Sequence, residues 1–165
     1  MKLIKHNITL IDRFMPLIDI LDDAQWSTEI PSINNETVGR HFRHISDFYL
    51  QFIQGLQSKE INYDRRERSE KFELQSIYAK DIFNKIKKNL LLCLENEDKI
   101  NIKMNQSIFP DTIESSINRE LMFLYDHAIH HAHIIQIAIT NQFPELNFKE
   151  EFYSPSTLES LECVQ

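Results

Sequence analysis

Three long stretches of this chain carry apolar residues at alternating spacings of four and three, which is the pattern of helices that bury one face. A looser stretch of the same kind lies near the N-terminus. Only two glycines and five prolines interrupt the 165 residues, whereas a β-sandwich of this length would need many more turn residues. The sequence therefore predicts an all-α chain that folds as a single four-helix bundle. The three clear seams run through Val38, Phe42, Ile45, Tyr49, Phe52 and Leu56, through Phe72, Ser76, Ala79, Phe83, Ile86, Leu90 and Cys93, and through Ile117, Leu121, Leu124, Ala128, His131, Ile135 and Ala138.

The expected helices span about residues 3–25, 35–58, 65–95 and 115–142 of one domain that covers residues 1–165. Pro16 is expected to kink the first helix. The predicted N-caps are Asn34 or Asn35 for the second helix, Asp64 for the third, and Ser115 or Ser116 for the fourth. The alternating segment INIKM predicts a short extended piece before the last helix. The aromatic but aperiodic C-terminal tail is expected to pack irregularly over the bundle.

Charge and cysteine content exclude several classes of protein. The formal net charge is −7, which argues against a nucleic acid or an anionic membrane surface as the main partner. Cys93 and Cys163 are the only cysteines and form no C-x-x-C motif, so the chain fits a reducing cytoplasm. The N-terminal segment lacks a signal-peptide core, and no stretch approaches the roughly twenty apolar residues of a membrane span. The sequence thus predicts a soluble cytoplasmic protein without nucleic-acid or membrane partners.

Histidines are concentrated in two of the predicted helices. His127 and His131 lie four residues apart in the last helix, so both rings face one side and could converge on one ion. A lone H-x-x-x-H pair is more often a pair of hydrogen-bonded core histidines than a metal site. His41 and His44 flank the apolar seam of the second helix, and this second cluster favours a three-histidine site. Three protein ligands with one open position are the catalytic form of a zinc-type site.

The remaining histidines and the missing motifs narrow the kind of site. His133 is expected to point away from the His127–His131 face, His6 is isolated, and His130 borders the face, where a surface or supporting role suits it. No E-x-x-H or H-E-x-x-H motif occurs, which removes ferritin-like di-iron sites and the common zinc metalloprotease helix. G-x-S-x-G, P-loop and G-x-G-x-x-G motifs are also absent. What remains is a histidine-rich mononuclear site within a bundle.

Two segments, HFRHISDFY in the second helix and FLYDHAIHHAHII in the last, resemble the DinB-like superfamily, which includes thiol-dependent S-transferases. The resemblance covers nearly the whole chain, and NYDRRERSE and PSTLESLE also resemble one subgroup of that superfamily. It implies a four-helix bundle that binds a divalent metal ion, zinc or nickel. The ligands that it implies are His44, which opens the family's H-x-x-D element, and the pair His127 and His131, with His130 as a frequent neighbour. His41 is an extra histidine, which would take the place of His44 if the alignment shifted by one helical turn.

Further side chains are candidates for the surroundings of the ion. Asp47, one turn from His44, either orients that histidine or lies in solvent or against an arginine. Arg40, one turn before His44, would sit at the mouth of the site, suited to a carboxylate or phosphate on a substrate. Glu120 lies two turns before the histidine pair, about 10 Å along the helix axis. From there it could line a pocket or receive Arg119 or an arginine from another element.

The YDRRER cluster has two interpretations. Runs of charge usually cover solvated faces, so the commoner one is a helix start with its arginines in solvent. The alternative is that Arg65 or Arg66 folds over the end of the bundle to meet Asp47 or an anionic ligand. Tyr63 could supply a hydroxyl to the same place.

The expected function is that of an enzyme-like metal-binding protein that acts on a small molecule. A divalent ion with an open position can lower the pKa of a bound thiol or water, as in transfer or hydrolysis. The thiol and a homodimer are implied by the resemblance alone. One alternative is a non-enzymatic metal-binding or stress-response module, which a fourth protein ligand such as His41 would favour. Another is a metal-free helical interaction protein whose histidines are hydrogen-bonded core.

Overall fold

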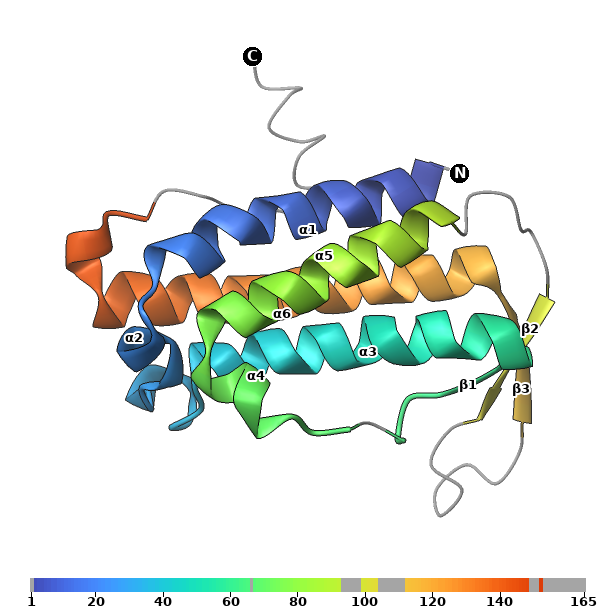
Figure 1. Cartoon of the computed structure of the whole chain (residues 1–165), viewed down its shortest axis with the longest axis horizontal. Helices are drawn as coiled ribbons and strands as arrows, with labels where there is room; N and C mark the ends of the chain where they lie inside the picture. The colour runs from blue at the N-terminus through green and yellow to red at the C-terminus, as the bar shows by residue number, and fades with distance from the viewer. Residues whose placement is uncertain (1, 66, 93–98, 104–111, 149–151, 153–165) are drawn as a thin grey trace.

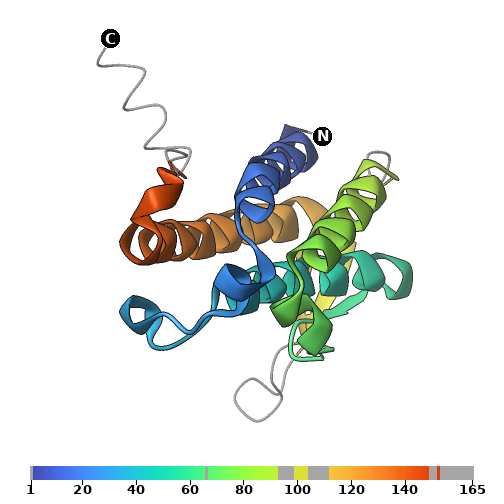
Figure 2. The same ribbon diagram turned by 60° about the vertical axis from the view of Figure 1, so that its left-hand side comes forward.

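The computed structural model describes residues 2–65, 67–92, 99–103, 112–148 and 152. Four long helices lie lengthwise beside one another: α1 (Lys2–Ile20), α3 (Val38–Ser58), α5 (Ser76–Leu92) and α6 (Ile117–Gln142) (Figure 1). Both α1 and α3 pack against both α5 and α6. Figure 2 shows the same helices in a turned view. The described part of the chain is therefore mostly helical, as predicted.

The shorter elements are two helical turns and two 3-10 turns: α2 (Asp23–Ser27), η1 (Pro31–Ile33), α4 (Glu70–Leu74) and η2 (Pro144–Leu146). Three short strands, β1 (Glu60–Asn62), β2 (Lys99–Lys103) and β3 (Thr112–Ser116), form a sheet in the order β1-β2-β3 at one end of the long helices (Figure 1). β1 is parallel to β2, with Glu60 opposite Asn101, and β2 is antiparallel to β3, with Lys99 opposite Ser116. β2 confirms the predicted extended piece, whereas its two partner strands were not predicted.

The second long helix begins later than predicted. Asn34 and Asn35 adopt left-handed backbone angles, with φ of 62° and 58°, so neither is an N-cap. Thr37 takes that role, and its hydroxyl accepts a hydrogen bond from the Arg40 backbone N–H at 3.0 Å. In α6, by contrast, Ser116 is the N-cap, as one of the two predicted alternatives, and the Arg119 N–H donates to its side chain at 3.2 Å.

The predicted first helix, residues 3–25, is two helices. α1 passes through Pro16 and ends at Ile20, and α2 follows as a separate helix. Asp22 and Gln25 form a capping box that starts α2: the Gln25 N–H donates to the Asp22 side chain, and the Asp22 N–H donates to the Gln25 side chain. This local capping explains why the helical pattern restarts after residue 21.

The predicted third helix, residues 65–95, is also divided, into α4 and α5. The Asp64 N–H donates to the Asn62 side chain in the turn after β1, so Asp64 does not cap the helix as predicted. Gln75 is extended between the two helices, and α5 begins at Ser76. The Asp23 carboxylate accepts hydrogen bonds from the Ser76 N–H at 2.9 Å and hydroxyl at 3.1 Å. A residue of α2 therefore supplies the polar partner at the start of α5, and residues 93–95 lie outside the described ranges.

Aromatic side chains form the centre of the core. Phe14, Phe42 and Phe83 come from three of the long helices and make mutual edge-to-face contacts, with ring centroids 5.3 to 5.8 Å apart. Trp26 stacks on Phe42 at 5.2 Å, and its indole N–H donates to the Phe72 carbonyl at 2.9 Å. All four rings are fully buried. α2 is thereby fixed against α3 and α4.

A buried asparagine links the helices that carry the histidines. The Tyr49 hydroxyl of α3 donates to Asn7 Oδ1 at 2.6 Å, and Asn7 Nδ2 donates to the carbonyls of Leu3 at 2.8 Å and of Leu121 in α6 at 3.1 Å. Burial raises the pKa of Tyr49, so its hydroxyl remains a donor. Because these bonds join α1, α3 and α6 inside the core, they help to set how α3 lies along α6.

The described part of the tail packs on the helices. Phe152 is fully buried, 5.7 Å from Phe14 between ring centroids, and it stacks on Phe148 at 6.4 Å. The rest of the predicted irregular tail, residues 149–151 and 153–165, lies outside the described ranges. Of the helices that the structure describes, none combines the length and the apolar character that crossing a membrane requires.

Candidate metal centre

Three histidines from two helices come together between α3 and α6. His44 of α3 and His127 and His131 of α6 each offer one ring nitrogen, and these atoms all lie within 4.8 Å of one another. The ring centroids are 4.6 to 5.0 Å apart. All three side chains are partly buried. The group could hold a metal ion, and it consists of the three histidines that the sequence predicted as ligands.

The helical period explains why these histidines meet. His127 and His131 lie one turn apart on α6, beside the buried Leu124, Ala128 and Ile135 that face the core. His44 precedes the buried Ile45 on α3, so it stands at the edge of the apolar stripe that packs against α6. Small Ala128, fully buried between the two histidines, leaves room for the imidazoles to face α3.

His41 is present in addition to His44 and does not replace it. Its Nδ1 lies 3.0 Å from His131 Nδ1, a hydrogen bond in which one ring donates and the other accepts. The Nε2 of His41 is buried and makes no hydrogen bond to any residue in the described ranges. A ligating histidine is usually oriented by a hydrogen bond from its second nitrogen. His41 is placed to orient His131 in that way.

Aromatic rings close one side of the group. Phe48 lies against both His44 and His127, with ring centroids at 4.9 and 4.3 Å. Tyr63 stacks on Phe48 at 5.1 Å, and Phe123 lies 5.6 Å from His127. These rings cover part of the group, whereas Arg40 and His41 line a hollow beside His44 and His131.

Tyr63 and Glu120 are bonded to each other rather than to the histidines. The Tyr63 hydroxyl donates to Glu120 Oε2 at 2.9 Å, while Ser115 and Arg119 donate to Oε1 at 2.6 and 2.9 Å. Glu120 is fully buried. Burial and then the Glu120 charge raise the pKa of Tyr63. Glu120 thus receives Arg119, one of its predicted roles. The Tyr63 hydroxyl, which one of the two interpretations of the YDRRER cluster placed near Asp47 or an anionic ligand, donates to Glu120 instead.

The arginines beside the histidines form ion pairs with carboxylates. Arg40 contacts Glu36 at 2.8 Å and Glu73 at 3.5 Å, and the Glu36 hydrogen bond is the main cause that raises the pKa of Arg40. Arg43, between the two histidines of α3, pairs with Glu73 and lies 3.7 Å from Asp47. These pairs tie α3 to α4. Asp47 therefore faces an arginine, as one of its two predicted interpretations has it.

A hollow of about 260 Å³ adjoins the histidines. Six side chains line it: Glu36, Arg40, His41, Arg43, His44 and His131. Two of the three grouped histidines therefore border open space. A small molecule could reach an ion in the group from this side.

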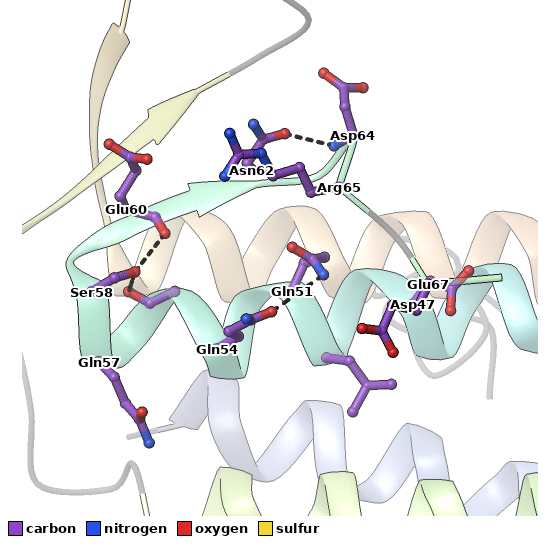
Figure 3. A pocket seen from close by; sticks show the side chains of 12 residues that line it. Asp47, Gln51, Gln54, Gln57, Ser58, Glu60, Asn62, Asp64, Arg65 and Glu67 are labelled. Carbon is purple, nitrogen blue, oxygen red and sulfur yellow. Dashed lines mark hydrogen bonds between the residues drawn. The ribbon is translucent and has the colours of Figure 1, made fainter. Parts of the chain in front are cut away.

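A second hollow, of about 900 Å³, lies further along α3 and contains none of the three histidines (Figure 3). Asp47 and Glu67 stand at one end of it and Ser58 and Glu60 at the other, with glutamines of α3 between them (Figure 3). Arg65 lines it too, so this predicted candidate shares a hollow with Asp47 and not with the ligands. Arg66 lies outside the described residues.

The other two histidines of α6, His130 and His133, lie outside the three-histidine group. His130 is exposed, with its ring 5.3 Å from that of His131. His133 forms a hydrogen bond of 3.1 Å with the Ile129 carbonyl one turn earlier in the same helix. Neither belongs to the group that could hold an ion.

Burial favours the neutral imidazole at two histidines of this cluster, His131 and His41. Burial, and then the neighbouring His127, His44 and His41, lower the pKa of His131 to about 3. Burial is also the main cause that lowers the pKa of His41. Neutral imidazole is the form that binds a metal ion. His131 is therefore in the form that can bind an ion at neutral pH.

Comparisons with family models, with curated proteins and with solved structures found no match for this chain. The case for a metal site therefore rests on the geometry of the three histidines alone. Sequence reasoning missed three residues that shape it: Phe48, Arg43 and Glu73. The position of Arg43 between two candidate histidines could have drawn attention to it in the sequence. Nothing in the sequence indicates that it pairs with Glu73 across the α3–α4 contact.

Proposed function

We propose that this chain is a divalent-metal-binding protein of the DinB-like superfamily, with one ion held by His44, His127 and His131. The observation that carries the proposal is the convergence of three imidazoles from two helices within 4.8 Å. Ligands from His-rich helices of this kind suit zinc or nickel. The arrangement of four long helices and the origin of the ligands, one from α3 and two from α6, support the superfamily and its four-helix bundle.

The proposed activity is transfer or hydrolysis on a small molecule, with a thiol-dependent S-transferase as the leading case. An ion with three protein ligands keeps an open position, in which it lowers the pKa of a bound thiol or water. The hollow beside His44 and His131 supports access by a small molecule. Phe48 and Tyr63 cover another part of the group. His41 fixes the ring of His131. We also propose, from the superfamily resemblance alone, that the chain forms a homodimer.

A second candidate is a structural, non-enzymatic metal site, and one contact favours it. His41 lies within hydrogen-bond distance of His131, so a rotation of its ring could make it a fourth ligand. A closed four-ligand site leaves no position for a substrate. The protein would then be a metal-binding or stress-related interaction module.

Metal analysis tests both candidates. The protein, purified without a histidine tag, is incubated with zinc or nickel, desalted and analysed beside His44→Ala, His127→Ala and His131→Ala. About one ion per chain in the wild type and its loss from each variant support the three-histidine site. If the wild type takes up no ion at all, the proposal is wrong and the histidines are hydrogen-bonded core. Loss of the ion from His41→Ala as well would favour the structural site.

A further inference from the structure

The hollow beside the histidines adjoins an apolar one. A space of about 440 Å³ lies between η1 and α6, and Glu36 and His41 line both it and the first hollow. Three isoleucines form much of its wall: Ile33 of η1, and Ile134 and Ile137 of α6. The two hollows adjoin at Glu36 and His41 and are together called the cleft here: His44 and His131 lie at one end and these isoleucines at the other.

The helical period of α6 aligns the two parts of the cleft. Ile134 follows His131 by three residues, and Ile137 follows Ile134 by three, so the row continues along one side of the helix. Ile33 is buried and Ile134 is partly buried, whereas Ile137 is 54% exposed at the rim. Such a half-open apolar space gains free energy when an apolar group covers it.

Charge at the polar end of the cleft argues against an anionic ligand. Arg40 and Arg43 are paired with three carboxylates, those of Glu36, Glu73 and Asp47. Glu36 also lines both hollows, where it would repel a carboxylate or phosphate. An uncharged group avoids this repulsion and needs no new ion pair. This differs from the predicted role of Arg40 as a site for a substrate anion.

We propose that the cleft selects a small molecule with a metal-binding donor atom joined to an uncharged aliphatic or aromatic group. The donor lies at the three histidines, and the apolar group lies among Ile33, Ile134 and Ile137. This inference rests on the proposed function, because the histidines must hold an ion. It adds the substrate class: short apolar compounds, selected by length and by lack of charge.

Straight-chain thiols of increasing length provide the test, because thiolate sulfur is a good ligand for zinc-like ions. The protein is loaded with Co²⁺, whose visible spectrum reports both occupancy of the site and binding of each thiol. We expect the dissociation constant to fall about two- to fourfold for each added methylene group until the apolar space is filled. A thiol of equal length that ends in a carboxylate should bind at least tenfold more weakly than its methyl-ended counterpart.

Two matched variants locate the effect. Ile137→Asn should flatten the dependence on chain length and leave the Co²⁺ spectrum without thiol unchanged. Met122→Asn changes a similarly exposed apolar side chain of α6 far from the cleft and should retain the dependence. If Co²⁺ binds but all thiols bind equally, or none binds, the inference is wrong and the metal site stands. If no Co²⁺ binds, the proposed function and the inference both fail.

Discussion

His41 Nδ1 lies 3.0 Å from His131 Nδ1, so the histidine of α3 outside the three-histidine group holds one member of that group in place. The role of His41 in this contact distinguishes the two proposed functions. As a hydrogen-bond partner His41 leaves the ion an open position, and as a ligand it closes the site. The variants below distinguish the two cases and probe the framework around them.

We expect His41→Ala to keep one ion per chain and to weaken binding by about 10–100-fold, the usual cost of removing a residue that orients a ligand. Competition with a chromophoric chelator measures the affinity. His130→Ala is the matched control, because His130 is an exposed neighbour of the same ring and should change the affinity little. A His41 variant that binds no ion would show His41 to be a ligand.

Without metal, the protein should lose stability as the pH falls. The unfolded chain takes up a proton on His131 near pH 6.5, whereas burial and neighbouring histidines lower its folded pKa to about 3. Between these values the unfolded state binds more protons, so the free energy of unfolding decreases as the pH decreases. Urea unfolding at several pH values between 7.5 and 4.5 measures this slope. In His131→Asn the slope should be shallower, and an equal slope would contradict its assignment to His131.

Gly39→Ala should destabilise the protein by about 1–3 kcal/mol, the cost of overpacking a core. A Cβ atom there would lie 2.4 Å from Trp26 Nε1 and 2.6 Å from the Glu73 carbonyl oxygen, so α3 and α2 would have to separate. Unfolding followed by the fluorescence of Trp26, the single tryptophan, reports the change. Gln54→Ala, at an exposed position of the same helix, should unfold like the wild type. Wild-type stability in Gly39→Ala would show that the contact relaxes without cost.

Glu120→Gln should destabilise the protein by about 1–3 kcal/mol, because a buried group that accepts three hydrogen bonds loses its charge and one acceptor. Tyr63→Phe removes one of these bonds and should cost about 1 kcal/mol. The two changes affect the same hydrogen bond. The double variant should therefore lose less stability than the sum of the losses in the two single variants. Chemical denaturation of all four proteins gives the coupling. Simple additivity would mean that the hydrogen bond contributes nothing.

The long helices and the histidine group were predictable because both depend on local period. Apolar residues three and four apart mark the buried face of α3, and the same arithmetic places His127 and His131 together. The local period does not predict that His44 of α3 lies beside the two histidines of α6. The resemblance to the DinB-like superfamily supplied that expectation.

What the sequence did not predict depends on contacts between distant residues. Asp23 caps α5 from another helix, so the break before Ser76 has no local signal. Two further contacts also join residues far apart in the chain: Arg43 pairs with Glu73, and the Tyr63 hydroxyl donates to Glu120. Side-chain charges were visible in the sequence, but the partner of each was not. For this reason Arg40 was predicted to bind a substrate anion, whereas in the structure it faces Glu36.

The parallel pairing of β1 with β2 also has a consequence for the order of folding. Glu60 and Asn101 are neighbours in the sheet, yet the whole of α4 and α5 lies between them in the chain. Closing so long a loop is slow and is favoured only once the intervening helices have packed. Tyr63 follows β1 directly and completes the aromatic wall beside His127. We therefore expect the aromatic side of the three-histidine group to form late, after the helices between β1 and β2 have packed.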